Sequence, residues 1–140
     1  MASLAQKLGL KPGQTICLLH ATAETAKVIR AACAEDVGGD VTISETIDGA
    51  PFDMIFYWPR ELAGLAERFA ALQRRIVSHG AIWVVLPRKA VARQRDHSLS
   101  WEEMQAAALT TDLVDNKNAS MTDEEYGTRF VIRKERRRQE

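Results

Sequence analysis

The sequence has few of the features that mark exported or membrane-bound proteins. It contains only two cysteines, and no apolar run approaches the ~20 residues that a bilayer span needs. No basic stretch followed by a hydrophobic segment stands at the amino terminus. Because Cys17 lies in a predicted strand and Cys33 in a predicted helix, we expect both to be reduced packing residues. These observations predict a cytoplasmic protein with no membrane segment.

The short motifs of common catalytic sites are also missing. The sequence has no Gly-x-Ser-x-Gly elbow, no P-loop and no Cys-x-x-Cys pair, and its three histidines are not at ligand spacing. An arrangement of His97 with Asp96 and the nearby serines stays open, although neighbours in sequence have the wrong geometry for a triad. The acidic residues 123–125 could hold a metal, but a polar turn also explains them. We therefore predict no catalytic, cofactor-binding or metal-ligating residues.

The charge of the chain is balanced overall but unevenly distributed. The formal net charge at pH 7 is zero, whereas residues 133–140 carry five basic and two acidic side chains. A basic tail can bind nucleic acid, but short charged carboxyl termini are usually solvated. The length of 140 residues suits one hydrophobic core. We therefore predict a single domain at 1–132 and a flexible basic tail at 133–140, and nucleic acid is not favoured as a partner.

The segment from Phe52 to Lys89 predicts a complete strand, helix, strand unit. Residues 53–58 form a nearly continuous apolar run, which is typical of a strand buried on both faces. Pro59 suits the first turn of a helix, and Gly80 suits a left-handed cap at its end. Between them lies an apolar stripe at helical spacing that is expected to face the sheet: Leu62, Leu65, Phe69, Leu72 and Ile76. Residues 81–86 predict the second strand, after a right-handed crossover.

The amino-terminal third predicts two helices and two strands. A short helix at 3–8, capped by Gly9, precedes a strand at 15–19. Thr22 suits the N-cap of a helix that extends to Ala34. A weak second strand is expected at 41–44.

The carboxyl-terminal third predicts a loop, a helix and a hairpin. Residues 90–98 have no convincing period, which favours a mobile loop. Ser100 and Glu103 stand in capping-box spacing, so a helix is expected at 101–109. Strands at 113–120 and 126–133 then form a hairpin, with the last strand antiparallel to the others.

This order of elements predicts the fold class: α/β, with a three-layer Rossmann-like sheet that is mostly parallel and ends in an antiparallel hairpin. It resembles a trimmed class I methyltransferase architecture. In that family, a turn like residues 10–13 commonly precedes a strand ending in an acidic residue and a glycine-rich loop for S-adenosylmethionine. Here Leu18 replaces the acid, and three residues replace the glycines: His20, Thr22 and Glu24. Without those glycines the backbone cannot approach a nucleoside closely.

Several segments resemble those of one uncharacterised bacterial family. They are residues 8–13, 52–53, 80–84 with 87–89, 113–117 and 126–130. The family is domain of unknown function 3052, and the likeness extends along nearly the whole chain. Two departures are Arg88, where a lysine is expected, and Tyr126 to Thr128, where a tryptophan followed by Ser-Gly is more typical. The resemblance implies a fold and supplies no catalytic residues.

The ends of the predicted parallel strands give one candidate binding site. In open α/β sheets, ligands bind beyond these carboxyl ends, near the point where strand order reverses. The residues that follow the strand ends are expected to converge on a weak anion site beside a helix amino terminus: His20, Thr22, Arg60, Arg88 and Lys89. The alternative is a solvated edge of loops.

Two classes of function stay open. The first is a non-catalytic Rossmann-like module that acts through protein contacts or weak binding of a small anion. It is favoured because methyl transfer requires a held cofactor, and nothing replaces the missing glycine loop. The alternative is a divergent S-adenosylmethionine-dependent methyltransferase-like enzyme.

Overall fold

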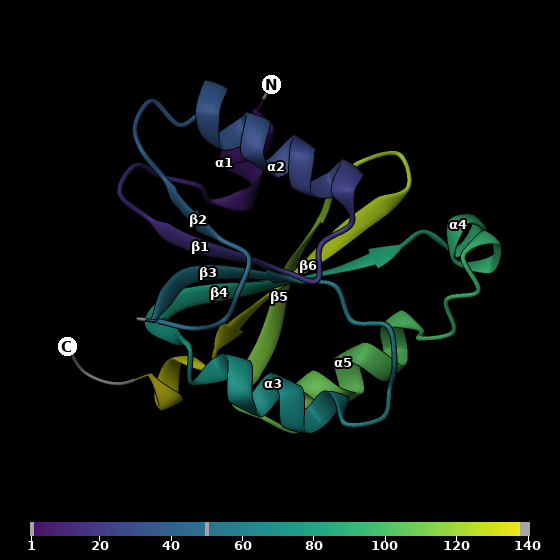
Figure 1. Ribbon diagram of the computed structural model, residues 1–140. Coiled ribbons are helices and arrows are strands. Elements are labelled where there is room, and N and C mark those ends of the chain that lie inside the picture. Colours follow the sequence, from purple (N-terminus) through teal and green to yellow (C-terminus); the bar gives the residue numbers. More distant parts are fainter. Residues whose placement is uncertain (1, 50, 138–140) are drawn as a thin grey trace.

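The computed structural model describes residues 2–49 and 51–137, which form a six-stranded sheet with helices on both faces (Figure 1). The strands are β1 (Thr15–Leu19), β2 (Thr42–Ser44), β3 (Phe52–Tyr57), β4 (Ile76–Pro87), β5 (Leu113–Ser120) and β6 (Glu125–Ile132). The helices are α1 (Leu4–Leu8), α2 (Ala23–Glu35), α3 (Leu65–Gln73), α4 (Lys89–Gln94), α5 (Trp101–Leu109) and the 3-10 turn η1 (Lys134–Arg136).

The sheet has the order β2-β1-β3-β4-β6-β5. The first four of these strands are parallel, whereas β6 pairs antiparallel with both β4 and β5. Helices α1 and α2 cover one face, and α3 and α5 cover the other (Figure 1). The predicted fold class is therefore confirmed: a mostly parallel, three-layer α/β sheet that ends in an antiparallel hairpin.

Strand β3 is the central strand that the apolar run predicts. Met54 and Phe56 pack into the core beneath α1 and α2, while Ile55 and Tyr57 pack into the core beneath α3 and α5. All four side chains are buried. Burial on both faces explains why the sequence from Met54 to Tyr57 is continuously apolar rather than alternating.

The helix after β3 is shorter than the sequence predicts, and the prediction that Pro59 begins it is wrong. Gly64 stands at the N-cap with a φ of 73°, so the helical backbone begins only at Leu65. Leu65, Phe69 and Leu72 are buried as expected, whereas Leu62 is 48% exposed in the preceding loop. The fifth residue of the predicted stripe, Ile76, is the first residue of β4.

The predicted left-handed cap at Gly80 is also wrong, because Gly80 lies inside β4. A Cβ atom there would lie 2.9 Å from the carbonyl oxygen of Asp53. The pairing of β3 with β4 is irregular between Phe52 and Met54, next to this contact. Glycine is needed here for the close approach of two strands and not for a positive φ.

The amino-terminal elements agree with their predicted bounds to within one residue. Ser3 and Gln6 form a capping box at the start of α1, and Gly9 ends that helix with a φ of 80°. Thr22 is the N-cap of α2, but its side chain makes no capping hydrogen bond to the helix backbone. The hydroxyl of Thr22 instead donates to the side chain of Glu125 in β6.

In the carboxyl-terminal third, the hairpin and α5 are confirmed and the loop is not. Ser100 and Glu103 form the predicted capping box of α5. Residues 90–94 of the predicted loop belong to α4 (Lys89–Gln94), none of whose residues is buried. This short helix projects from the end of β4, away from the sheet (Figure 1). Because no side chain of α4 packs fully into the core, its sequence carries no apolar period to detect.

The basic tail begins as an ordered turn. Lys134–Arg136 form η1, and Nε of Arg137 donates to the carbonyl oxygen of Ile132 over 2.9 Å. The rest of the predicted tail, residues 138–140, lies outside the described residues. No helix in the described part of the chain is long and apolar enough to cross a membrane.

Candidate functional site

The carboxyl ends of the parallel strands meet beside a buried glutamate that begins β6. Glu125 pairs with Pro87 at the end of β4, because β6 runs antiparallel and therefore starts where the parallel strands end. Its side chain is only 2% exposed. An isolated buried carboxylate would be costly, so its partners decide whether it is tolerated.

Four side chains satisfy this carboxylate. Oε1 of Glu125 accepts hydrogen bonds from the hydroxyl of Thr22 at 2.8 Å, from the indole of Trp58 at 3.2 Å and from the hydroxyl of Thr25. Oε2 accepts from Nη1 of Arg95 at 2.6 Å. Burial raises the pKa of Glu125, but the hydrogen bonds from Thr25, Arg95, Thr22 and Trp58 outweigh burial and leave that pKa below its usual value. The carboxylate is therefore held ionised.

This network closes the point where strand order reverses. The loops after β1 and β3 lie on either side of the reversal, and they supply Thr22 and Trp58. The cavity that remains among His20, Thr22, Arg60, His97 and Glu125 has a volume of only about 20 Å³. That is close to the space of one water molecule. The chain's own carboxylate thus occupies the amino end of α2, where an anionic ligand would otherwise find its donors.

Arg95 ties the segment around α4 to this network. Besides its contact with Glu125, Nη2 of Arg95 lies 2.8 Å from Oε2 of Glu124. Nε2 of His97 lies at hydrogen-bonding distance, 3.1 Å, from the carbonyl oxygen of Pro59. The hydroxyl of Ser100 accepts from the backbone of Glu103 as a helix cap. Two residues of the catalytic arrangement that the sequence left open, His97 and Ser100, thus make structural contacts.

A larger hollow lies on the α3 side of the same sheet edge. Its volume is about 460 Å³, and its wall includes His20, Tyr57, Arg60, Glu61 and Arg68. Arg60 and Arg68 carry positive charge. Burial raises the pKa of Tyr57, and the nearby cation of Arg68 lowers it by a smaller amount. Gly64, the N-cap of α3, supplies no side-chain capping hydrogen bond, and this helix end also borders the hollow. The local field is therefore suited to an anion.

His20 holds an unusual backbone conformation at the mouth of the hollow. Its φ is 62°, in the left-handed region that glycine usually occupies. The sequence comparison with the methyltransferase architecture placed His20 where a glycine is common. The backbone turn is thus retained although the glycine is not, and a histidine side chain now stands beside the crevice.

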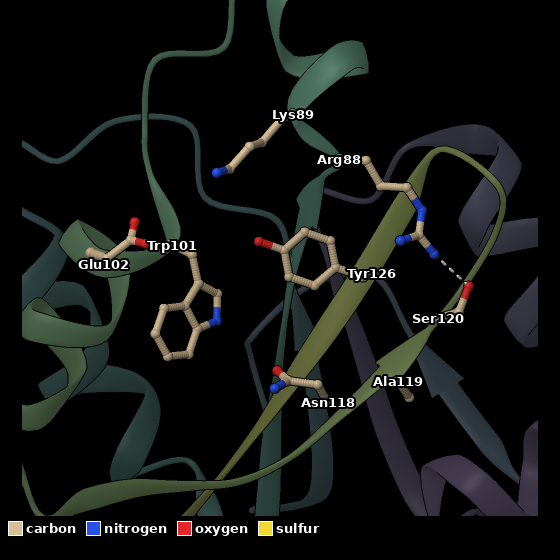
Figure 2. A pocket seen from close by; sticks show the side chains of 8 residues that line it. All are labelled: Arg88, Lys89, Trp101, Glu102, Asn118, Ala119, Ser120 and Tyr126. Atoms are coloured by element: carbon tan, nitrogen blue, oxygen red, sulfur yellow. Dashed lines mark hydrogen bonds between the residues drawn. The ribbon is translucent and has the colours of Figure 1, made fainter.

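The five residues of the predicted anion edge fall into two groups. His20, Thr22 and Arg60 border the small closed cavity, and His20 with Arg60 also border the hollow. Arg88 and Lys89 border a separate groove of about 570 Å³ with Trp101 and Tyr126 (Figure 2). All five follow the ends of parallel strands, but the Glu125 network lies between the two groups. Thr22 is already committed to Glu125.

Sequence reasoning missed Glu125, Arg95 and Arg68. In the sequence Glu125 is part of a predicted polar turn with Asp123 and Glu124. One signal was present: an antiparallel last strand must begin at the edge where parallel strands end, which places the first residue of β6 at the site. Arg95 gave no such signal, because its partners lie 29 and 30 residues away.

The fold is similar to that of several methyltransferases of known structure. N-methyltransferase NodS from Bradyrhizobium japonicum has a TM-score of 0.59 and 13% identity, and the match covers 92% of this chain and 91% of that one. A putative methyltransferase from Thermoplasma acidophilum gives a TM-score of 0.55, 8% identity and coverages of 95% and 76%. An S-adenosylmethionine-dependent methyltransferase from Clostridium acetobutylicum has a TM-score of 0.54 and 7% identity, and the match covers 87% of this chain and 84% of that one. At these identities the likeness establishes a methyltransferase-like fold alone.

Sequence comparison assigns the chain to a family. No curated protein matches the sequence. The model of one protein family matches residues 5–134, which is nearly the entire chain. The chain therefore belongs to the family described as protein of unknown function DUF3052.

Proposed function

We propose that this protein is a non-catalytic Rossmann-like module that binds a small anion weakly, in the hollow bordered by His20, Arg60 and Arg68. The observation that carries the proposal is the position of Glu125, whose carboxylate fills the strand-order reversal. A cofactor with a nucleoside and a charged tail has no room in a 20 Å³ cavity. A cytoplasmic location is part of the proposal and fits two unpaired, buried cysteines.

The charges around the hollow support an anion as the ligand. Arg60 and Arg68 are exposed, and in the described ranges 2–49 and 51–137 neither guanidinium has a carboxylate within 4.0 Å. Both are thus free to turn toward a ligand. Glu61 borders the same space and opposes an anion, which limits the expected affinity to the millimolar range.

A phosphate titration followed by NMR tests this proposal. We expect amide shifts at His20 and at the start of α3, from Gly64 to Ala66, at tens of millimolar phosphate. The double change Arg60→Ala with Arg68→Ala removes two cations from the hollow and should abolish these shifts. The matched control, Lys27→Ala with Arg74→Ala, removes two exposed cations elsewhere and should leave them unchanged. Unmoved amides would count against the anion and favour a protein-contact role.

The second candidate is a divergent S-adenosylmethionine-dependent methyltransferase-like enzyme. It is supported by the glycine-like φ of His20 and by the similarity in fold to NodS, which was also solved in complex with S-adenosyl-L-homocysteine. For this candidate Glu125 would have to leave the amino end of α2 to admit the cofactor. Four side-chain contacts hold it there, which makes this the less favoured reading.

A further inference from the structure

A second groove opens on the opposite side of β6 from Glu125. Its volume is about 570 Å³, the largest of the surface hollows described above. The lining residues come from the start of α4, the start of α5 and the β5–β6 hairpin: Arg88, Lys89, Trp101, Glu102, Asn118, Ala119, Ser120 and Tyr126 (Figure 2). It shares no lining residue with the hollow around Arg60.

Two aromatic side chains form the walls of this groove. The indole of Trp101 extends from the first turn of α5, and the phenol of Tyr126 extends from β6 into the same space (Figure 2). Nε1 of Trp101 donates to the hydroxyl of Thr128 over 2.8 Å, and Thr128 is only 1% exposed. This buried contact fixes the ring plane, so a flat ligand would meet a surface that is already ordered.

The same buried threonine orients an amide at the floor of the groove. Its hydroxyl donates to Oδ1 of Asn118 over 2.6 Å. Because Oδ1 is the acceptor in that contact, the amide NH₂ of Asn118 is the part left for a ligand. Trp101, Thr128 and Asn118 thus form one chain of hydrogen bonds that begins and ends at the groove.

Positive charge lies along one rim. Arg88 is held by Ser120, with 2.8 Å between Nη2 and Oγ, and by the carbonyl oxygen of Asp123, with 3.1 Å from Nε. The exposed side chain of Lys89 extends over the groove (Figure 2). Burial and the nearby carboxylate of Glu102 raise the pKa of Tyr126, more than the cation of Arg88 lowers it, so the phenol stays a donor.

We propose that this groove binds a small molecule with a planar unsaturated ring and one acidic group, a carboxylate or a phosphate. The ring lies between Trp101 and Tyr126, the acidic group faces Arg88 and Lys89, and the amide of Asn118 donates to an acceptor on the ring. A long polyanion is a poor fit, because Glu102 borders the groove and Asp123 adjoins Arg88 at its rim. The inference is independent of the anion in the other hollow.

Titrations with four probes test it: indole-3-acetate, adenosine 5′-monophosphate, adenosine and inorganic phosphate. The NMR signal of the Trp101 indole N–H reports binding of all four probes. We expect saturable binding of indole-3-acetate or adenosine monophosphate with a Kd of about 1 mM or below. Adenosine lacks the acidic group and phosphate lacks the ring, so each should bind at least tenfold more weakly. The stronger of the first two probes distinguishes a carboxylate from a phosphate ligand.

Two exposed positions provide variants that should fold normally. Lys89→Ala removes a rim charge, and Asn118→Asp keeps the acceptor for Thr128 while removing the amide donor. Each should weaken binding at least tenfold, whereas Lys11→Ala, on the opposite sheet edge, should not. The double change Arg60→Ala with Arg68→Ala should leave probe binding in the groove unchanged. That result separates this site from the anion site of the proposed function. The proposal is overturned if neither ring-bearing acid binds below about 10 mM, or if both groove variants bind as the wild type does.

Discussion

The hydroxyl of Thr22 donates to Oε1 of Glu125 over 2.8 Å, joining residues that are 103 positions apart. The contact links the first crossover of the sheet to its last strand. Thr25 and Trp58 donate to the same oxygen atom, and Arg95 binds the other one. Thr22, at the N-cap of α2, therefore holds a carboxylate at the sheet edge and makes no capping hydrogen bond to the helix backbone.

Changing Glu125 to glutamine should destabilise the protein by about 2–4 kcal/mol. Glutamine can keep an acceptor toward Thr22 only by turning its NH₂ group toward Nη1 of Arg95, so two donors then face each other. Chemical denaturation measures the loss. Glu124→Gln is the matched control, because the Glu124 side chain is 58% exposed and its ion pair should contribute under about 1 kcal/mol. Equal losses in the two variants would contradict the role given to Glu125.

The same carboxylate should make stability depend on pH. The pKa of Glu125 is lower in the folded protein than in the unfolded chain, because the contacts from Thr25, Arg95, Thr22 and Trp58 outweigh the effect of burial. Its contribution is therefore fully present above the ordinary glutamate pKa of about 4.3 and is lost as pH falls through the lower folded value. Denaturation between pH 7 and pH 3 should show a smaller loss in Glu125→Gln than in the wild type. Parallel curves would argue against this coupling.

Phe69 anchors α3 on the sheet, and Phe69→Ala should cost about 3–5 kcal/mol. The side chain is 0% exposed, and its ring centroid lies 6.1 Å from those of both Tyr57 and Phe130. Leu62→Ala removes a similar apolar group from a side chain that is 48% exposed, and it should cost under about 1 kcal/mol. Denaturant melts compare the two. A loss below about 1 kcal/mol at Phe69 would mean that α3 does not pack as described.

The sequence predicts those parts of the fold whose signals are local. The continuous apolar run of β3 and the capping box at Ser100 and Glu103 both hold. Predictions failed where a glycine or a solvated segment had two interpretations. Gly80 suits a helix cap as well as a close strand contact, and only the neighbouring carbonyl of Asp53 decides between them.

The candidate site was predictable only in part, for a related reason. Strand order alone brings His20, Thr22 and Arg60 to one edge. The separation of Arg88 from them depends on Glu125, which inserts between the two groups through contacts about 100 residues distant in sequence. Such long-range contacts produce no periodic pattern in the sequence.

Calorimetric titration with S-adenosylmethionine and S-adenosyl-L-homocysteine tests most directly whether Glu125 closes the crevice at the strand-order reversal. We predict no measurable heat of specific binding for either compound at up to about 1 mM. The cavity of about 20 Å³ at the strand-order reversal cannot admit a nucleoside, and the sequence has no glycine-rich loop to hold one in the adjacent hollow of about 460 Å³. A saturable isotherm with a micromolar Kd for either compound would contradict the claim and favour the methyltransferase-like enzyme.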